Sequence, residues 1–149
     1  MMIEQLLDQE QESIVDVEKL SVTFGSQEIL QDITLRIPPG QTLALLGESG
    51  CGKTVLMKSI IGLVKPTKGK IEFDGGNINR LNERQLSRMR LRFGFIFQNA
   101  ALFDSMTIGQ NVAFPLRQHG RFSDNQIREM VLSRLSEVGL PDSVVFKKP

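Results

Sequence analysis

Two stretches near the N-terminus have the residue pattern of β-strands. Residues 14–24 are rich in β-branched side chains, and Ile33, Leu35 and Ile37 alternate with polar neighbours, as in a strand with one buried face. Pro38-Pro39-Gly40 then indicates a turn. The apolar run that follows, 43–46, is continuous, which is typical of a strand covered on both faces in a parallel sheet.

Further along the chain, helical and strand-like patterns alternate. Residues 55–61 have a helical register, and Gly62 predicts the C-terminal cap. Short strands are expected at 70–73 and 93–97. Between them, 82–92 predicts a helix that Asn82 caps, with Gln85 at the third helical position.

A last helix is expected near the C-terminus of the sequence. Ser123 and Gln126 form a capping-box pattern, and Gly139-Leu140-Pro141 ends the run. Between them, apolar side chains recur at helical spacing: Ile127, Met130, Val131, Leu135 and Val138. Strands alternating with helices indicate an α/β domain.

Composition narrows the class of protein. The 149 residues are 40% apolar and carry a net charge of +1, so bulk charge gives no reason to expect a nucleic-acid partner. The single cysteine excludes an internal disulfide and favours a reducing compartment. Residues 1–13 are acidic, unlike a signal peptide, and no apolar run could span a bilayer. We therefore expect a cytoplasmic protein with an acidic tail, 1–13, and one domain, 14–149.

The clearest candidate site is the glycine loop at 47–54. Gly47, Gly50 and Gly52 allow the backbone N–H groups to point inward as an anion nest, and the helix that follows adds its positive end. Lys53 would reach the β- and γ-phosphates of ATP, and the hydroxyl of Thr54 would bind Mg²⁺. The alternative is a glycine turn that only joins a strand to a helix. The buried strand before the loop and the helix after it favour phosphate binding.

Three segments resemble the nucleotide-binding subunits of ABC transporters. They are "VTFGSQEILQDITLRIPPGQTLALLGESGCGKTVL", "PTKGKIEFDG" and "FGFIFQNAALFDSMTIGQNVAFPL", and the resemblance covers 14–149. It implies a P-loop NTPase fold of ABC type, which is a three-layer α/β core with an antiparallel β portion. The segment after Gln98 would be a helical subdomain that is cut short.

The resemblance also implies roles for individual residues. Phe24 would stack on adenine, unless it is a core residue that ends a strand. Gln98 would contact Mg²⁺ or the attacking water as the Q-loop glutamine, and only the resemblance supports this role. Lys53 and Gln98 would both contribute to catalysis, but the expected catalytic site is not complete. Thr54 and Gln98 are the expected metal ligands. The full expected nucleotide site is Phe24, Gly47, Glu48, Ser49, Gly50, Cys51, Gly52, Lys53, Thr54, Val55 and Gln98.

Within the family, "SMTIGQNVAFPLRQHG" and "VLSRLSEVGL" resemble the Mla-type ATPases of lipid-trafficking importers. This resemblance implies a membrane permease as partner and a lipid as cargo. It further implies a homodimer of nucleotide-binding subunits in the full-length form, held on the cytoplasmic face of the inner membrane through the permease. A soluble ABC-type ATPase without a membrane partner is the alternative, and the segment "NVAFPL" argues against it.

The sequence also departs from the family pattern. Val55 replaces the second hydroxyl residue that many members have after the loop lysine, and the signature loop, the Walker B strand and the switch histidine are not found. His119, the only histidine, is out of order for the switch and is expected in an exposed loop. We therefore expect ATP binding without hydrolysis by this chain alone, which leaves its enzyme class open, and marginal stability because residues 43–46 would lie at an open sheet edge. A non-hydrolysing regulatory module is a further alternative.

Two features have both a functional and a purely structural interpretation. Cys51 lies inside the glycine loop, where alkylation would block nucleotide binding, but it also suits the position as a small residue. A basic cluster is expected either to be a solvated helix face or to contact a permease or anionic lipid headgroups. Its members are Arg80, Arg84, Arg88, Arg90 and Arg92.

Overall fold

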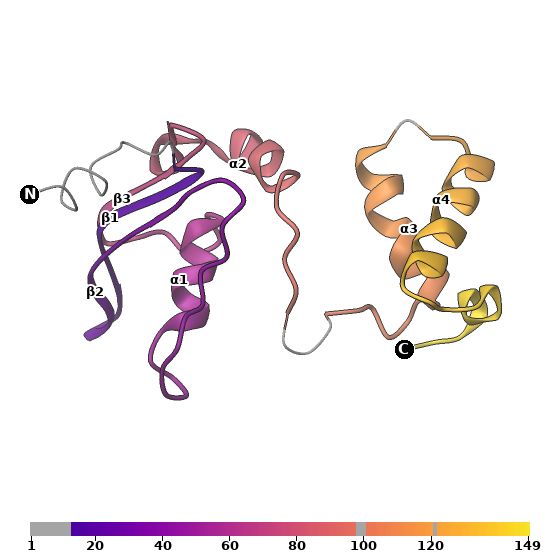
Figure 1. Ribbon diagram of the computed structural model, residues 1–149, viewed down its shortest axis with the longest axis horizontal. Coiled ribbons are helices and arrows are strands. Elements are labelled where there is room, and N and C mark those ends of the chain that lie inside the picture. The colour runs from indigo at the N-terminus through magenta and orange to yellow at the C-terminus, as the bar shows by residue number, and fades with distance from the viewer. Residues whose placement is uncertain (1–12, 98–100, 121) are drawn as a thin grey trace, which may run out of the picture. The chain divides into compact units, whose positions relative to one another are not determined.

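The computed structural model describes residues 13–97, 101–120 and 122–149. The chain divides into two compact units, 1–94 and 95–149 (Figure 1). Of the expected acidic tail 1–13, residues 1–12 lie outside the described residues. The tail and domain boundaries at 13 and 14 stay predictions.

The first unit contains an antiparallel sheet of four strands in the order β2-β1-β3-β4. The two long strands confirm the β-branched pattern of 14–24 and the alternating pattern of 33–37, and the third confirms the strand expected at 70–73. The strands are β1 (Val15–Phe24), β2 (Gln27–Ile37), β3 (Lys68–Phe73) and β4 (Gly76–Asn77).

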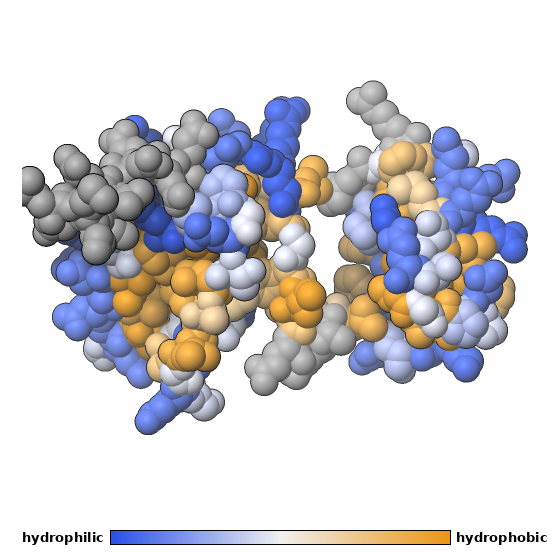
Figure 2. All heavy atoms as spheres, in the orientation of Figure 1, coloured by the Kyte–Doolittle hydropathy of each residue, from blue (hydrophilic) through white to orange (hydrophobic). Residues whose placement is uncertain are grey.

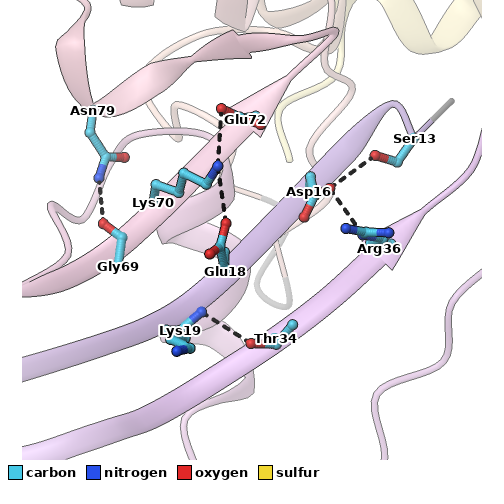
Figure 3. Close-up of polar contacts among 10 residues, drawn as sticks. All are labelled: Ser13, Asp16, Glu18, Lys19, Thr34, Arg36, Gly69, Lys70, Glu72 and Asn79. Carbon is cyan, nitrogen blue, oxygen red and sulfur yellow. Dashed lines mark hydrogen bonds and ion pairs between the residues drawn. The ribbon is translucent and has the colours of Figure 1, made fainter. Parts of the chain in front are cut away.

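A bulge in β1 lets the strand bury two pairs of side chains. Val15 and Val17 are buried, and so are Leu20 and Val22, so the alternation changes phase by one residue between the pairs. Lys19 lies at this point with φ 47°, and its N–H donates to the Thr34 hydroxyl at 3.0 Å (Figure 3). The extra residue of a bulge accounts for the phase change, which a strict period of two does not predict.

Ion pairs connect the strands on the exposed side of this sheet. The Nζ atom of Lys70 on β3 lies 3.0 Å from the carboxylate of Glu18 on β1 and 3.6 Å from that of Glu72 (Figure 3). The hydrogen bond and charge of Lys70 lower the pKa of Glu18. In return, Glu18 raises the pKa of Lys70.

Replacing Lys70 with Met is expected to raise the pKa of Glu18 toward its ordinary value, which NMR titration of the carboxyl carbon measures. Because the folded state lowers the pKa of Glu18, its contribution to stability is present above the unfolded pKa and is lost as the pH falls through the folded value. Because the pKa of Lys70 is raised, its contribution is lost as the pH rises through that value. The variant Lys68→Met, at an exposed site on the same strand, should leave the pKa of Glu18 nearly unchanged; an equal rise in both variants would contradict the pair.

Two helices complete the core of the first unit. They are α1 (Lys53–Ile60) and α2 (Glu83–Arg90), with the short 3-10 helix η2 (Ile78–Arg80) before α2. Leu56 of α1 and Leu86 and Met89 of α2 join the core formed by the sheet. The helix expected at 82–92 is therefore confirmed with slightly shorter bounds, and Asn82 and Gln85 form the expected capping box. Gly62 follows α1 at φ 70°, as expected for a C-terminal cap.

Two expected strands are absent, and this corrects the sequence interpretation. Residues 41–48 and 93–97 have no strand structure, and the side chain of Leu46 is 93% exposed. A parallel strand exists only if neighbouring strands pair with its N–H and C=O groups, and in the described residues no strand pairs with either segment. Figure 2 shows apolar side chains gathered on the face of the first unit that is turned toward the viewer. The expected marginal stability stays a prediction.

The second unit is helical, as expected for the helical subdomain. It contains α3 (Ile108–His119), α4 (Asp124–Glu137) and the 3-10 helix η3 (Asp142–Phe146). Its core consists of Ala113, Ile127, Val131 and Leu135. The capping box of Ser123 and Gln126 is confirmed. The sequence interpretation did not predict α3, so His119 ends a helix instead of lying in a loop.

Candidate phosphate-binding site

The N-terminus of α1 offers backbone donors to an anion. The helix begins at Lys53, and its N-cap residue Gly52 has φ 94° and makes no side-chain capping bond. The first N–H groups of an α-helix have no partner within the helix, and here no cap side chain supplies one. Together with the positive end of the helix dipole, these donors suit a phosphate group.

The glycines of the loop are required by its geometry. A Cβ at Gly47 would lie 2.7 Å from the sulfur of Cys51, and a Cβ at Gly52 would lie 2.7 Å from the Cδ2 atom of Leu30 on β2. Gly50 has φ 83° with open space where a Cβ would be. Gly47 and Gly52 therefore allow close packing, and Gly50 and Gly52 allow the left-handed backbone.

The side chain of Lys53 turns back into the loop. Its Nζ atom donates to the carbonyl oxygens of Gly47 and Glu48, each at 2.7 Å, and lies 3.4 Å from the sulfur of Cys51. The loop backbone thus closes around an ammonium group at the start of a helix. This arrangement places a positive charge beside the N-terminus of α1, whose first N–H groups suit a phosphate.

The remaining loop side chains differ in their surroundings. Glu48, Ser49, Cys51 and Thr54 are exposed, so the thiol is accessible, and the Thr54 hydroxyl is free to face a ligand at the second position of α1. Val55 packs against the core of the first unit. The nucleotide role expected for each of these residues stays a prediction.

A magnesium ion fits this donor set. The described residues contain no group of three or more His, Cys, Asp or Glu side chains that could hold a metal. Mg²⁺ usually keeps several waters and takes one or two protein ligands beside substrate phosphates. The exposed hydroxyl of Thr54, at the start of α1 beside the candidate phosphate loop, matches that chemistry.

Phe24 ends β1 in the hairpin that also supports the loop. Its side chain is 52% exposed, which favours a binding role over the alternative of a core residue. Gly52 packs against Ile29 and Leu30 of the partner strand β2, so one hairpin carries both Phe24 and the residues that support the loop. Gln98 lies outside the described residues, so its expected role stays a prediction.

Asn111 is a structural anchor that the sequence analysis did not find. Its amide oxygen accepts from the N–H of Phe103 at 2.8 Å, and its amide nitrogen donates to the carbonyls of Phe103 and Thr107 at 3.1 and 3.0 Å. It thus holds the segment that follows Gln98 against α3. An asparagine inside an apolar pattern could have indicated this role, because asparagine is a poor helix former whose side chain binds backbone groups.

Replacing Asn111 with Ala is expected to destabilise the second unit by about 2 kcal/mol, since it leaves the backbone groups of Phe103 without these partners. Urea unfolding followed by the helical circular dichroism signal measures this change. The control Gln118→Ala removes an exposed amide from the same helix and should change stability little. Equal stability of the two variants would contradict the anchor role.

The structure divides the basic cluster. Arg92 lies 2.7 Å from Asp74 and stacks over the ring of Phe73, and Arg90 donates to carbonyls at the end of α1. Arg80, Arg84 and Arg88 are exposed. Two of the five arginines therefore stabilise the first unit, and the role of the other three stays a prediction.

Comparisons with known proteins support the interpretation of the fold. An ATP-binding cassette, solved as a dimer in a post-hydrolysis state bound to ADP and Pi, matches with a TM-score of 0.81 at 28% identity, over 91% of this chain and 61% of that chain. CbiO1 from Clostridium perfringens, part of an ABC transporter complex, matches with a TM-score of 0.74 at 27% identity, over 92% of this chain and 54% of that one. The P-loop ABC-type fold is thereby confirmed.

Curated relatives match at higher identity. "Probable ribonucleotide transport ATP-binding protein mkl" of Mycobacterium tuberculosis is 44% identical over 85% of this chain and 35% of its own length. The intermembrane phospholipid transport system ATP-binding protein MlaF is 40% identical in Haemophilus influenzae, over 87% of this chain and 49% of its own length. The Escherichia coli K12 MlaF is 37% identical, over 90% and 50%. The chain spans half the length of these relatives or less.

The family profile described as ABC transporter matches residues 30–149. This range contains the glycine loop, α1 and all the elements that follow, and it covers well over half of the chain. Its start falls in β2, the strand that supports Gly52. The chain belongs to the ABC transporter family.

Proposed function

We propose that this chain binds Mg·ATP through residues 47–54 as the ATP-binding subunit of an ABC transporter. The observation that carries this proposal is the glycine loop closed around the Lys53 ammonium at the start of α1. Family membership supports ATP as the ligand, and a cassette of similar structure is bound to ADP and Pi.

Individual residues have distinct roles in the proposed site. Lys53 and the backbone N–H groups of the loop bind the β- and γ-phosphates, and Thr54 contributes its hydroxyl to Mg²⁺. Phe24 stacks on adenine from the end of β1. Gln98 contacts Mg²⁺ or water, as the family resemblance implies. Bound Mg²⁺ would neutralise phosphate charge.

The proposed transport system moves a lipid through a membrane permease. The support is the phospholipid transport named for the two MlaF relatives. The mkl relative is named for ribonucleotide transport, which makes ribonucleotide the second candidate cargo. None of the helices in the described part of the chain is long and apolar enough to cross a membrane.

In the proposed system, the chain works on the cytoplasmic side of the inner membrane. The permease holds it there, and it pairs with a second nucleotide-binding subunit. The dimeric state of the similar cassette supports the pairing. Copurification of a tagged chain with a membrane permease tests this part of the proposal, and recovery of the chain without any permease would favour a soluble ATPase.

This chain alone is expected to bind Mg·ATP without turning it over, because the sequence carries no recognisable signature loop and no catalytic glutamate after a Walker B strand. A phosphate-release assay on the purified chain, run beside a nucleotide-binding titration, measures both properties. Binding with no release above the buffer rate is the expected result. Release at many turnovers per minute that Lys53→Met abolishes would contradict it, and absence of both binding and release would contradict the proposed function.

A further inference from the structure

The carbonyl end of α1 is bound by an arginine from α2. The Nε atom of Arg90 donates to the carbonyl of Ile61 at 3.0 Å, and its Nη2 atom donates to that of Gly62 at 2.7 Å. Ile61 is the C-cap of α1 and Gly62 follows it, so both carbonyls lie near the negative end of the helix dipole. A planar guanidinium with two parallel donors binds both carbonyls at once.

Arg90 is held in place by its own surroundings. Its side chain is only 27% exposed, and its Nη1 atom lies 3.7 Å from the carboxylate of Glu83 on the same helix. Gly62 permits the close approach, because a Cβ there would lie 2.9 Å from the Cδ2 atom of Leu86 and 3.6 Å from the Nη2 atom of Arg90. Since Glu83 is exposed, its ion pair adds little, and the two carbonyl bonds are the main contacts.

The length of α1 makes its two ends interdependent. The helix has eight residues, so it spans about 12 Å, and a helix this short is not stable without tertiary contacts. Its buried side chains are Leu56 and Ser59, and the hydroxyl of Ser59 is bonded within the helix to Val55. At its C-terminal end, Ile60 packs against the core and Ile61 is buried. The backbone N–H of Leu63 caps the carbonyl of Lys58, and the contact with Arg90 ties this end to α2.

We infer that Arg90 is a positioning residue for the nucleotide site. By holding the carbonyl end of α1, it fixes the position of the helix whose first residue is Lys53, and so it aims the Lys53 ammonium and the first-turn N–H groups at the phosphates. This inference rests on the proposed function. Arg90 itself does not contact the nucleotide, so its replacement should weaken the binding of ATP and the binding of ADP by the same factor.

The test compares Arg90→Gln with Arg84→Gln and Arg88→Gln, which remove the same charge from exposed positions on the same helix. The dissociation constants of Mg·ATP and Mg·ADP are measured at a temperature where circular dichroism shows each variant folded. Arg90→Gln is expected to raise both constants about fivefold, a coupling of ordinary size. Arg90→Lys should recover part of the loss because it keeps the charge, and the two controls should stay within about twofold of the parent chain.

The outcomes separate this inference from the proposed function. A parent chain with no affinity for Mg·ATP overturns the proposed function and the inference with it. In a second outcome, the parent chain binds Mg·ATP, and the Arg90→Gln variant melts at a lower temperature but binds Mg·ATP equally well. This outcome overturns the inference alone and leaves Arg90 a stabilising residue. If Arg90→Gln does not fold, Arg90→Lys is compared with Arg88→Lys: a higher dissociation constant only in the first supports the inference, and equal constants overturn it.

Discussion

Replacing Lys53 with Met is expected to weaken the binding of Mg·ATP about 100-fold, since charge-assisted hydrogen bonds to phosphate are lost and each contributes about 1.5–3 kcal/mol. In the structure the Nζ atom of Lys53 lies within the loop, 2.7 Å from two of its carbonyl oxygens. Methionine keeps the length of the side chain but cannot donate. Titration of each variant with a fluorescent ATP analogue measures the change.

The control for this substitution is Lys65→Met. Lys65 is exposed in the segment after α1, so its replacement changes the net charge equally without touching the loop. Its dissociation constant should stay within about twofold of the parent chain. If Lys53→Met and Lys65→Met bind Mg·ATP equally well, the charge of Lys53 does not bind the phosphates. The assignment of this loop as the nucleotide site is then wrong.

Replacing Gly52 with Ala is expected to weaken nucleotide binding at least about tenfold more than replacing Gly50 with Ala. Both glycines have left-handed backbones, at φ 94° and φ 83°, so both substitutions introduce strain of about 1–2 kcal/mol. Only at Gly52 would the new methyl group also overlap β2, 2.7 Å from the Cδ2 atom of Leu30 and 3.1 Å from the carbonyl of Ile29. The loop must therefore shift away from β2, and the N–H groups of α1 shift with it.

The comparison of the two alanine variants isolates the packing against β2 from backbone strain. Binding is measured by the same titration, and urea unfolding of each variant reports its stability. If Gly50→Ala and Gly52→Ala bind nucleotide equally, the contact with Leu30 and Ile29 does not shape the loop. A larger loss of affinity at Gly52, with both variants folded, supports the packing of the loop against β2.

Local signals in the sequence predicted the parts of the fold that local interactions determine. The alternation of Ile33, Leu35 and Ile37 matched β2 because one face of that strand packs on the core. The capping boxes at Asn82 and Ser123 matched the starts of two helices, since a cap is satisfied within four residues. The glycine loop was recognisable because its spacing follows directly from the backbone conformation it requires.

Features that depend on distant partners were not predicted. Residues 43–46 have the composition of a buried strand, but a strand also needs neighbours to pair with. Helix α3 is an exception with a local cause: Thr107 and Gln110 form a capping box, but Pro115 lies inside the helix, where proline is normally unfavourable. The contact of Arg90 with Gly62 joins residues 28 positions apart, and no local pattern indicates it.

Nucleotide binding at residues 47–54 is tested most directly by an equilibrium titration of the purified chain with Mg·ATP, with folding checked by circular dichroism in the same buffer. We expect saturable binding of one nucleotide per chain, competition by ADP and by pyrophosphate, and loss of binding in Lys53→Met. A folded parent chain that shows no saturable binding, or that binds Mg·ATP equally well with Met at position 53, would contradict it.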